Sequence, residues 1–261
     1  MKKTLLDKIP ENLPSEILSL VGDYPLYDSS CSPEARVYFL ARDGGYYIKR
    51  APSGTLLFEA QMSSYFNKKG LGAEVLLHLS GEYDWLLTRS VIGEDCTHRK
   101  YLENPKRLCD TLATQLRSLH DLDFSDCPKK DKMTDYLGTA KRNFDLGLFD
   151  PSFILKPDCF SSSGEAFDFL LKGHTAFKND VLLHGDFCLP NVILDDWNLS
   201  GYIDLGGAGV GDRHIDLFWG AWTLNFNLGT DEYRERFFDA YGRDLIDKDK
   251  LLLVSVAEAF G

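Results

Sequence analysis

The chain has 261 residues, of which 44% are hydrophobic and 26% are charged, as in an ordinary globular protein. Its length allows one large domain or two modest ones with a sizeable core. The formal net charge of -11 argues against binding to nucleic acid or to an anionic membrane surface, because both favour a basic face. An acidic protein can favour a cationic substrate. More commonly, however, a negative net charge serves only to keep a protein soluble.

The cysteines and the N-terminus indicate the compartment. The six cysteines show neither a Cys-x-x-Cys pair nor the His and Cys spacing of a zinc site, so we expect reduced thiols. Asp7, Lys8 and Pro10 interrupt the N-terminus before the apolar segment of a signal peptide could form. No apolar run approaches the ~18 residues of a membrane span. We therefore predict a soluble, cytoplasmic protein. As a separate expectation, it is a monomer or a weak dimer.

The first ninety residues predict an antiparallel sheet with one inserted helix. Alternating residues around the turn at Gly44-Gly45 are typical of a hairpin, and helical spacing after Pro52 stops at Lys69-Gly70. The predicted strands are residues 36–41, 46–49, 74–79 and 84–90, and the predicted helix is residues 55–67.

The pattern changes after Gly93 and becomes mostly helical. Asn104-Pro105 starts a helix with a leucine face that ends near His120. Further helices are predicted over 132–147 and 163–177, with a loop over 150–164, and from 214 onward with breaks at 228–230 and 242. Short strands are predicted at 181–183 and on both sides of the turn 195–198. We expect an α+β protein with a small sheet lobe, residues 1–92, and a larger helical lobe, residues 93–261.

The most informative segment is His184-Gly185-Asp186-Phe187-Cys188-Leu189-Pro190-Asn191, followed by Ile203-Asp204-Leu205-Gly206. Asp186 follows a buried strand, where a carboxylate can orient a hydroxyl nucleophile. Asn191 and Asp204 offer the hard oxygen ligands that magnesium prefers. A lone Asp-Gly-type loop is usually only a turn, but the joint pattern is specific for phosphoryl transfer. These residues therefore indicate a kinase.

Lys49 lies in an apolar strand, where an inward ammonium needs a counter-charge, and Glu59 on the next helix is the expected partner. The alternative is a lysine on the solvated side of the strand. The turn that ends at Ser32 lacks glycine, and its hydroxyls either bind phosphate or simply form a polar loop.

Two residues near the motif are predicted to be structural. We expect His184 to brace the loop and Asp216 to support it from a helix beneath. The aromatic residues Phe218, Trp219, Trp222 and Phe226 are spaced on one helical face and are interpreted as core.

Together these residues resemble the aminoglycoside 3'-phosphotransferase (kanamycin kinase) family. The resemblance extends from the Ser32-Pro33 turn to the C-terminus. It depends on both motifs above, on Gly211-Asp212-Arg213 with Asp216, and on Leu119-His120 with Ser125-Asp126-Cys127-Pro128. It implies a protein-kinase-like bilobal fold, ATP or alternatively GTP with two magnesium ions, and phosphate transfer to the 3'-hydroxyl of an aminoglycoside antibiotic.

The resemblance also implies a role for individual residues. Asp186 is the catalytic carboxylate, Asn191 and Asp204 bind magnesium, and Lys49 contacts the α- and β-phosphates with Glu59 as its partner. Tyr47 stacks on adenine, and the backbone of Arg89 to Val91 reads the adenine edge. Glu258 and the terminal carboxylate of Gly261 are expected to bind the ammonium groups of the drug. Apart from the resemblance, a polycationic drug needs several carboxylates, and the loop residues Asp158, Asp150 and Glu165 are weaker candidates for this role.

Three departures from the family pattern concern substrate range. Gly207 stands where the family commonly has arginine, Ala257 replaces an acidic residue, and Gly261 extends the chain by one residue. Two rival functions are a kinase for another small amino alcohol and a nucleotide-binding pseudo-enzyme that acts as a scaffold. The intact set of Lys49, Asp186, Asn191 and Asp204 argues against the scaffold.

Overall fold

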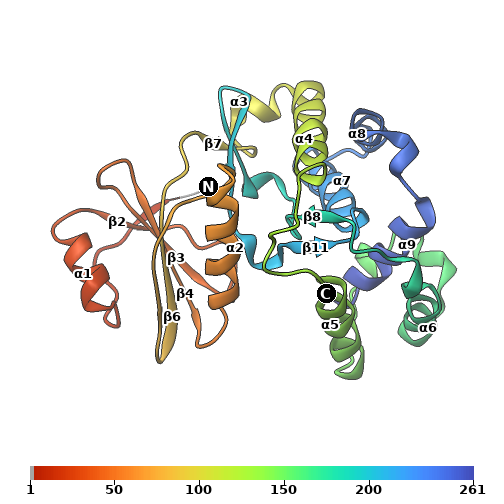
Figure 1. Ribbon diagram of the computed structural model, residues 1–261, viewed down its shortest axis with the longest axis horizontal. Helices are drawn as coiled ribbons and strands as arrows, with labels where there is room; N and C mark the ends of the chain where they lie inside the picture. The colour runs from red at the N-terminus through yellow and green to blue at the C-terminus, as the bar shows by residue number, and fades with distance from the viewer. Residues whose placement is uncertain (1–2) are drawn as a thin grey trace. The chain divides into compact units, whose positions relative to one another are not determined.

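The computed structural model describes residues 3–261, which form two compact units. The first unit contains the residues up to 98 together with 190–206, and the second contains 99–189 and 207–261. The first unit is rich in strands and the second in helices (Figure 1). No helix of the described part of the chain is long and apolar enough to cross a membrane.

The first unit is built on an antiparallel sheet of order β1-β2-β3-β4-β6-β5. Its strands are β1 (Thr4–Leu5), β2 (Leu26–Asp28), β3 (Arg36–Leu40), β4 (Tyr46–Pro52), β5 (Val75–Ser80) and β6 (Tyr83–Arg89). The inserted helix α2 (Leu57–Lys68) runs beside this sheet, as the orange helix in Figure 1 shows. The predicted sheet and helix are confirmed, whereas α1 (Ser15–Val21) was not predicted.

The two faces of this sheet have different roles because side chains alternate along a strand. On one face, Leu40 and Ile48 are fully buried against Ile17 and Val21 of α1. The opposite face carries Lys49, which pairs with Leu86 across β4 and β6. Leu86 packs against Ala60 of α2, so α2 covers the face that presents Lys49.

A second sheet of the first unit has the order β10-β9-β7. It contains β7 (Glu94–Asp95), β9 (Val192–Asp195) and β10 (Asn198–Tyr202), all paired antiparallel. Gly93 precedes β7 with φ 110°, and a Cβ there would lie 2.3 Å from the carbonyl oxygen of Leu194. Only glycine allows the chain to pass so close to β9.

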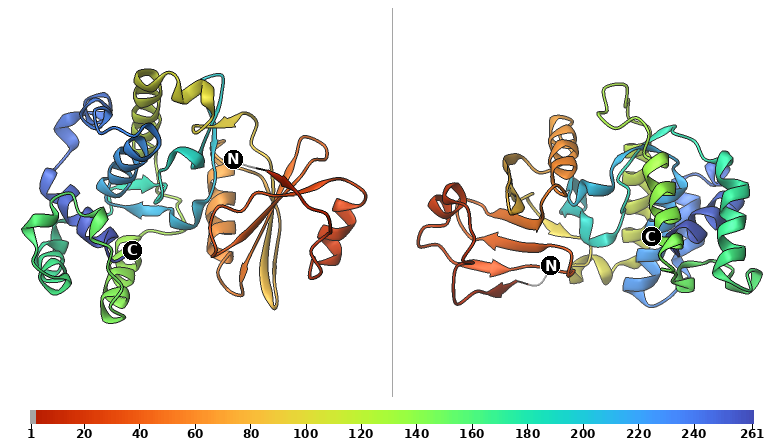
Figure 2. Two further views of the ribbon diagram at one scale, coloured as in Figure 1. Left: turned by 180° about the vertical axis from the view of Figure 1, so that it is seen from behind. Right: turned by 90° about the horizontal axis from the view of Figure 1, so that it is seen from below.

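The second unit is mainly helical, as predicted. Its helices are α3 (Arg99–Leu102), α4 (Pro105–His120), α5 (Met133–Asp145), α6 (Ser163–Gly173), α7 (His214–Leu228), α8 (Tyr233–Tyr241) and α9 (Lys248–Glu258). Helix α4 contacts α7 and α8, while α9 contacts α6 and α7. Figure 2 shows the ribbon from two further sides. The predicted strand β8 (Val181–Leu183) pairs with β11 (Gly209–Gly211), which was not predicted.

The loop region and the aromatic residues of α7 differ in part from the prediction. The predicted loop over 150–164 contains the 3-10 turns η1 (Pro151–Phe153) and η2 (Pro157–Cys159). Phe218 is buried as predicted, but Phe226 is 70% exposed, and Trp219 and Trp222 are only half-buried. The interpretation as core is therefore confirmed for Phe218 and wrong for Phe226, while Trp219 and Trp222 lie between the two.

Candidate active site

Lys49 lies between two carboxylates in the first unit. Its Nζ is 3.0 and 2.8 Å from the two carboxylate oxygens of Glu59 and 2.8 Å from Oδ1 of Asp204. The Lys49 side chain is 20% exposed and that of Glu59 is 10% exposed. Burial alone lowers the pKa of Lys49, but the charges of Asp204 and Glu59 outweigh it and raise this pKa above its ordinary value. The predicted Lys49–Glu59 pair is confirmed, and the alternative of a solvated strand lysine is wrong.

Asn191 and Asp204 lie at neighbouring ends of the β9–β10 hairpin. The backbone N–H of Ile203 donates to the carbonyl of Asn191 at 3.1 Å, which fixes the residue before Asp204 against Asn191. Asn191 is buried, whereas half of the Asp204 side chain is exposed. Asp204 has φ 60°, a left-handed conformation that is uncommon outside glycine and that often marks a functional position.

This donor set fits a magnesium ion. A carboxylate and an amide supply hard oxygens, and Mg²⁺ typically binds one or two such side chains and completes its shell with water and phosphate oxygens. No group of three or more His, Cys, Asp or Glu side chains that could hold a metal occurs among residues 3–261. Asn191 and Asp204 therefore suit a metal that also binds phosphate oxygens and water.

Tyr47 lies two residues before Lys49 on the same strand and face. Its ring lies 5.1 Å from that of Phe39, and the ammonium of Lys3 lies 3.3 Å from the centroid of the Phe39 ring. Burial, followed by the charges of Asp95 and Glu94, raises the pKa of Tyr47 to about 12, so the phenol is neutral. The structure thus provides a half-buried aromatic surface beside Lys49.

The remaining predicted nucleotide contacts are less enclosed. The Arg89 side chain pairs with Glu74 at 2.9 Å, and its backbone N–H donates to the carbonyl of Glu74. Val91 is half-buried and Ser32 is exposed. In the turn before β3 it is the hydroxyl of Ser30 that is used locally, as it accepts from the N–H of Val37 at 2.9 Å.

Asp186 belongs to the second unit, where Asp216 of α7 holds the loop that carries it. The Asp216 carboxylate accepts from the backbone N–H groups of His184 at 2.8 Å and Gly185 at 2.7 Å. The ring of His184 is fully buried, and its Nδ1 accepts from the N–H of Asp186 at 3.3 Å. The predictions that His184 and Asp216 brace this loop are confirmed.

The loop also depends on a close approach of two glycines. Gly185 has φ 84°, and a Cβ on it would lie 1.9 Å from the carbonyl oxygen of Gly207. A Cβ on Gly207 would in turn lie 2.9 Å from the carbonyl carbon of Gly185. Any side chain at 207 would therefore require the backbone of this loop to shift.

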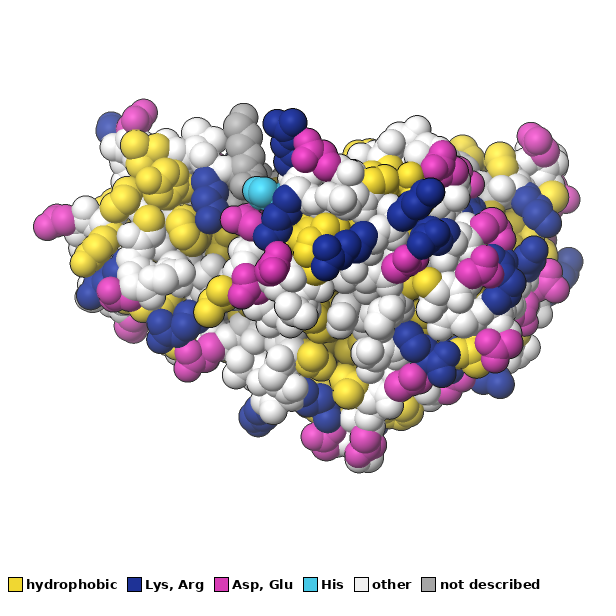
Figure 3. All heavy atoms as spheres, turned by 90° about the horizontal axis from the view of Figure 1, so that it is seen from above, with side chains coloured by type: hydrophobic (Ala, Val, Ile, Leu, Met, Phe, Trp, Pro, Cys, Tyr) yellow, Lys and Arg dark blue, Asp and Glu magenta, His cyan; other side chains and the backbone are white. Residues whose placement is uncertain are grey.

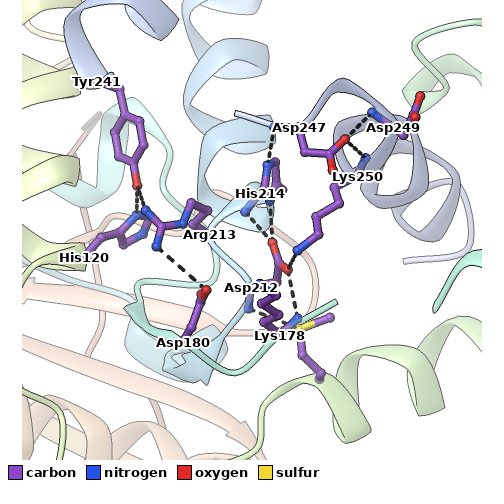
Figure 4. Close-up of polar contacts among 11 residues, drawn as sticks. His120, Lys178, Asp180, Asp212, Arg213, His214, Tyr241, Asp247, Asp249 and Lys250 are labelled. Carbon is purple, nitrogen blue, oxygen red and sulfur yellow. Dashed lines mark hydrogen bonds and ion pairs between the residues drawn. The ribbon is translucent and has the colours of Figure 1, made fainter. Parts of the chain in front are cut away.

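A buried chain of hydrogen bonds supports Asp216 from behind, as Figure 4 shows in part. Arg213 donates to the hydroxyl oxygen of Tyr241 at 3.3 Å, and this hydroxyl lies 2.8 Å from Nδ1 of His120. Nε2 of His120 is 3.1 Å from Asp216. Because Tyr241 accepts from Arg213, its proton points to His120, which therefore donates to Asp216 through Nε2–H. The sequence pattern did not predict this role of Tyr241, because Tyr241 is far from Asp216 along the chain.

A second buried cluster in Figure 4 fixes the start of α9. The Asp212 carboxylate accepts from Lys250 at 2.8 Å, from the N–H of Lys178 at 2.9 Å and from Nδ1 of His214 at 2.5 Å. Burial alone raises the pKa of Asp212, but hydrogen bonds from His214 and Lys250 lower it far below its ordinary value. Nε2 of His214 accepts from the N–H of Asp247, the N-cap of α9. This cluster orients the helix that ends at Glu258.

Glu258 is a buried carboxylate at the end of α9 in the second unit. Its Oε1 accepts from the hydroxyl of Tyr136 at 2.9 Å and from the indole N–H of Trp219 at 3.1 Å. Burial raises the pKa of Glu258 to about 7, and the charge of Asp186 adds to this increase. Gly261 adjoins it, since its N–H donates to the carbonyl of Glu258 at 2.9 Å.

The three acidic candidates of the loop region are exposed. Asp158 lies in η2, Asp150 caps η1 through the N–H of Ser152, and Glu165 bonds Ser161. The backbone N–H of Asp150 donates to the carbonyl of Ala259, next to Glu258, at 2.8 Å. All three acidic residues stay predictions as acceptor ligands.

The comparisons with known proteins agree with this geometry. The sequence model of the phosphotransferase enzyme family matches residues 33–252, and the chain belongs to this family of enzymes. The chain is 50% identical over 252 residues to a probable aminoglycoside 3'-phosphotransferase of Lactococcus lactis subsp. lactis, covering 96% of each chain. It is 33% identical over 255 residues to the aminoglycoside 3'-phosphotransferase of Niallia circulans, covering 94% of this chain and 96% of the relative. The predicted membership of the aminoglycoside 3'-phosphotransferase group is confirmed.

Solved structures support the same fold. The crystal structure of an aminoglycoside-3'-phosphotransferase of type VIII matches with a TM-score of 0.75 and 28% identity, covering 94% of this chain and 97% of that chain. The aminoglycoside phosphotransferase APH(3'')-Id of Streptomyces rimosus, in complex with ADP and streptomycin, matches with a TM-score of 0.71 and 24% identity, covering 86% and 90%. At that identity the second likeness bears on the fold alone. The predicted kinase-like α+β fold is confirmed.

Proposed function

We propose that this phosphotransferase moves the γ-phosphate of ATP to the 3'-hydroxyl of kanamycin- or neomycin-type aminoglycosides and thereby confers resistance to them. The observation that carries the proposal is the placement of Lys49 between Glu59 and Asp204, in a chain half identical to a probable enzyme of this kind. A lysine fixed by a glutamate is what a kinase uses to hold phosphates. Because ATP is the donor, we assign the reaction to the cytoplasm.

The nucleotide site is assigned to the N-terminal lobe, residues 1–92, with the remainder of the chain forming the catalytic and acceptor-binding lobe. Lys49 binds the α- and β-phosphates while Glu59 keeps it in place. Tyr47 offers an aromatic face to adenine, and the segment from Arg89 to Val91 offers backbone groups to its edge. Ser32 is the phosphate-side hydroxyl, and GTP is the alternative donor to test.

Asn191 and Asp204 would hold Mg²⁺. The bound ion would neutralise charge on the phosphate oxygens of the nucleotide. Lys49 then has two tasks. Without nucleotide, its three N–H groups are taken up by both carboxylate oxygens of Glu59 and by Asp204. With nucleotide bound, the N–H that Asp204 accepts is given to the phosphates instead.

Asp186 is the residue that acts on the acceptor. Its carboxylate accepts a hydrogen bond from the 3'-hydroxyl and orients the oxygen for attack, while the loop is kept rigid by Asp216 and by the approach of Gly185 to Gly207. Positioning and charge neutralisation supply most of the acceleration in such a reaction, because its transition state is loose.

The acceptor carries several ammonium groups, and acidic side chains are assigned to them. Glu258 and the terminal carboxylate of Gly261 are the principal ligands, with Asp158 as a further one. A screened surface pair contributes about 1 kcal/mol or less, so several pairs or a desolvated one are needed. The buried position of Glu258 makes it the strongest of the three.

The experiment is incubation of the protein with kanamycin, ATP and Mg²⁺, followed by mass spectrometry and by NMR of the product. We expect a single added phosphate on the 3'-oxygen. Phosphorylation of a different amino alcohol, with none of any aminoglycoside, would favour a kinase of other specificity. Nucleotide binding without any phosphoryl transfer would favour the scaffold.

A further inference from the structure

Four aromatic side chains form a continuous row on the second unit. Trp219, Trp222 and Phe226 are spaced i, i+3 and i+7 along α7 and therefore share one face of the helix. The rings of Trp219 and Trp222 are 5.4 Å apart, and those of Trp222 and Phe226 are stacked at 4.9 Å. Phe153 of η1 adds a ring 5.8 Å from Trp219 and 6.0 Å from Trp222. We call these four residues the aromatic row.

The aromatic row lies at the edge of the core, against which Phe153 packs. The core side of α7 is formed by Leu217, Ala221 and Leu224, which are almost completely buried. Phe226, by contrast, is 70% exposed, and the other members of the row are half-buried. Exposed apolar side chains that occur singly are ordinary, but a contiguous row beside placed polar groups is typical of a ligand site.

One end of the aromatic row meets the catalytic machinery of the same unit. The indole N–H of Trp219 donates to Glu258. The charge of Asp186 contributes to the raised pKa of Glu258. In addition, the hydroxyl of Thr223, next to Trp222, accepts from the N–H of Leu189 at 3.1 Å, three residues after Asp186. The row therefore begins beside the acceptor carboxylates and extends outward along α7 to Phe226.

We propose that the aromatic row is a platform on which the amino-sugar rings of the acceptor lie, so that Trp222 and Phe226 determine acceptor specificity. This inference rests on the proposed function. Aromatic faces carry negative potential and attract ammonium groups and the polarised C–H groups of a saccharide. Glu258 at one end supplies the charge that favours a cationic ring there. The carboxylates alone bind charge without selecting ring shape, and the platform adds that selection.

The test compares acceptor kinetics of Trp222→Ala, Trp222→Phe and Phe226→Ala with the wild type, using kanamycin as the varied substrate. We expect Trp222→Ala to raise the KM for kanamycin about 10-fold and Phe226→Ala about 5-fold, with the loss falling on KM rather than kcat. Trp222→Phe keeps a ring and should stay within about twofold of the wild type. Leu171→Ala on α6 removes an apolar side chain of comparable exposure away from the row and is the matched control. Phe226 is so exposed that its variant should fold normally.

The outcomes separate this inference from the proposed function. If both alanine variants keep the wild-type KM for kanamycin, the proposed platform is wrong. Phosphorylation of kanamycin in the same assays would still support the proposed enzymatic function. A dimer in sedimentation that the alanine variants convert to a monomer, at unchanged KM, would make the row a subunit interface and also overturn it. If the wild type phosphorylates no aminoglycoside, calorimetric titration with kanamycin decides. Binding that both alanine variants weaken supports the platform, and absence of binding to the wild type refutes it.

Discussion

At the scale of single residues, Lys49 offers the sharpest test of the nucleotide site. Replacement by methionine keeps the length of the side chain but removes the cation. A charge-assisted hydrogen bond is worth about 1.5–3 kcal/mol, so we expect Lys49→Met to raise the KM for ATP about 10- to 100-fold. The measurement is steady-state kinetics with ATP varied. Lys68→Met, at the exposed end of α2, should leave this KM unchanged.

Lys49→Met is also expected to lower the stability of the folded protein, and a double variant provides the control for this effect. Without the ammonium, the buried Glu59 lacks its counter-charge. Since removal of one partner of a largely buried pair is destabilising, Lys49→Met should lower the free energy of unfolding by about 1–3 kcal/mol. The double variant Lys49→Met with Glu59→Gln should recover most of this loss but none of the ATP affinity. Recovery of both would show that Lys49 acts only in folding.

Glu258 predicts a dependence of stability on pH. Its pKa is about 7 in the folded protein against an ordinary value of 4.5, so between these pH values the folded state binds more protons than the unfolded state. The free energy of unfolding therefore falls as pH rises from about 4.5 to 7, by up to about 3 kcal/mol in total. Glu258→Gln can accept from Tyr136 and Trp219 without this titration.

Urea unfolding at pH 5 and pH 8 measures the effect. Glu258→Gln should match the wild type at pH 5 and exceed its stability at pH 8. The exposed Glu11 provides the control, because Glu11→Gln should change stability little at either pH. Equal stability of Glu258→Gln and the wild type at pH 8 would contradict the raised pKa.

At the scale of elements, the loop that carries Asp186 depends on Gly185. Alanine there combines a left-handed backbone with a clash 1.9 Å from the carbonyl of Gly207. We expect Gly185→Ala to reduce kcat at least 100-fold by displacing Asp186, since small misplacements are costly in catalysis. Gly229→Ala at the end of α7 has a similar φ of 67° and open space around its Cβ. It should cost only about 1 kcal/mol of stability and leave kcat unchanged.

The elements that were predicted have strong local signals. The helix α4 starts at Pro105 as its Asn104-Pro105 signal indicates, and its leucines form one buried face. The strand β11 lacks such a signal, since Gly209-Val210-Gly211 has low strand propensity and pairs because β8 lies beside it. The helix α1 is short and buries only Ile17 and Val21, which is too little periodicity to detect.

At the scale of the whole molecule, the sequence indicates those parts of the site that are contiguous. His184 to Asn191 and Asp204 form a local pattern, and Lys49 with Glu59 follows from a strand and the next helix. The support of Asp216 by His120 and Tyr241 comes from three helices, so no spacing reveals it. The sequence also did not reveal that Phe226 is exposed, because α7 has apolar side chains on both its buried and its exposed face.

Ligand-linked stability tests the assignment of nucleotide and acceptor functions to different residues. A ligand at 100 times its Kd stabilises the folded state by about 2.7 kcal/mol, which corresponds to a rise in Tm of about 5–10 °C for a protein of this size. We expect ATP with Mg²⁺ to raise Tm in this way, and chelation of the metal by EDTA to remove most of the rise. Lys49→Met should lose the rise in Tm because a phosphate contact is missing, and Asp204→Asn should lose it because a magnesium ligand is missing.

Asp186→Asn should behave in the opposite manner. The asparagine keeps the shape of the side chain but cannot accept the hydroxyl proton, so turnover should fall by about 100-fold or more, while the thermal shift with ATP and Mg²⁺ stays at the wild-type value. Thermal unfolding and turnover measured on the same preparations provide both readouts. A lost thermal shift together with normal turnover in Asp186→Asn would place Asp186 in nucleotide binding. Because Asp186 and Lys49 would then share one function, the division of labour between nucleotide and acceptor residues would be wrong.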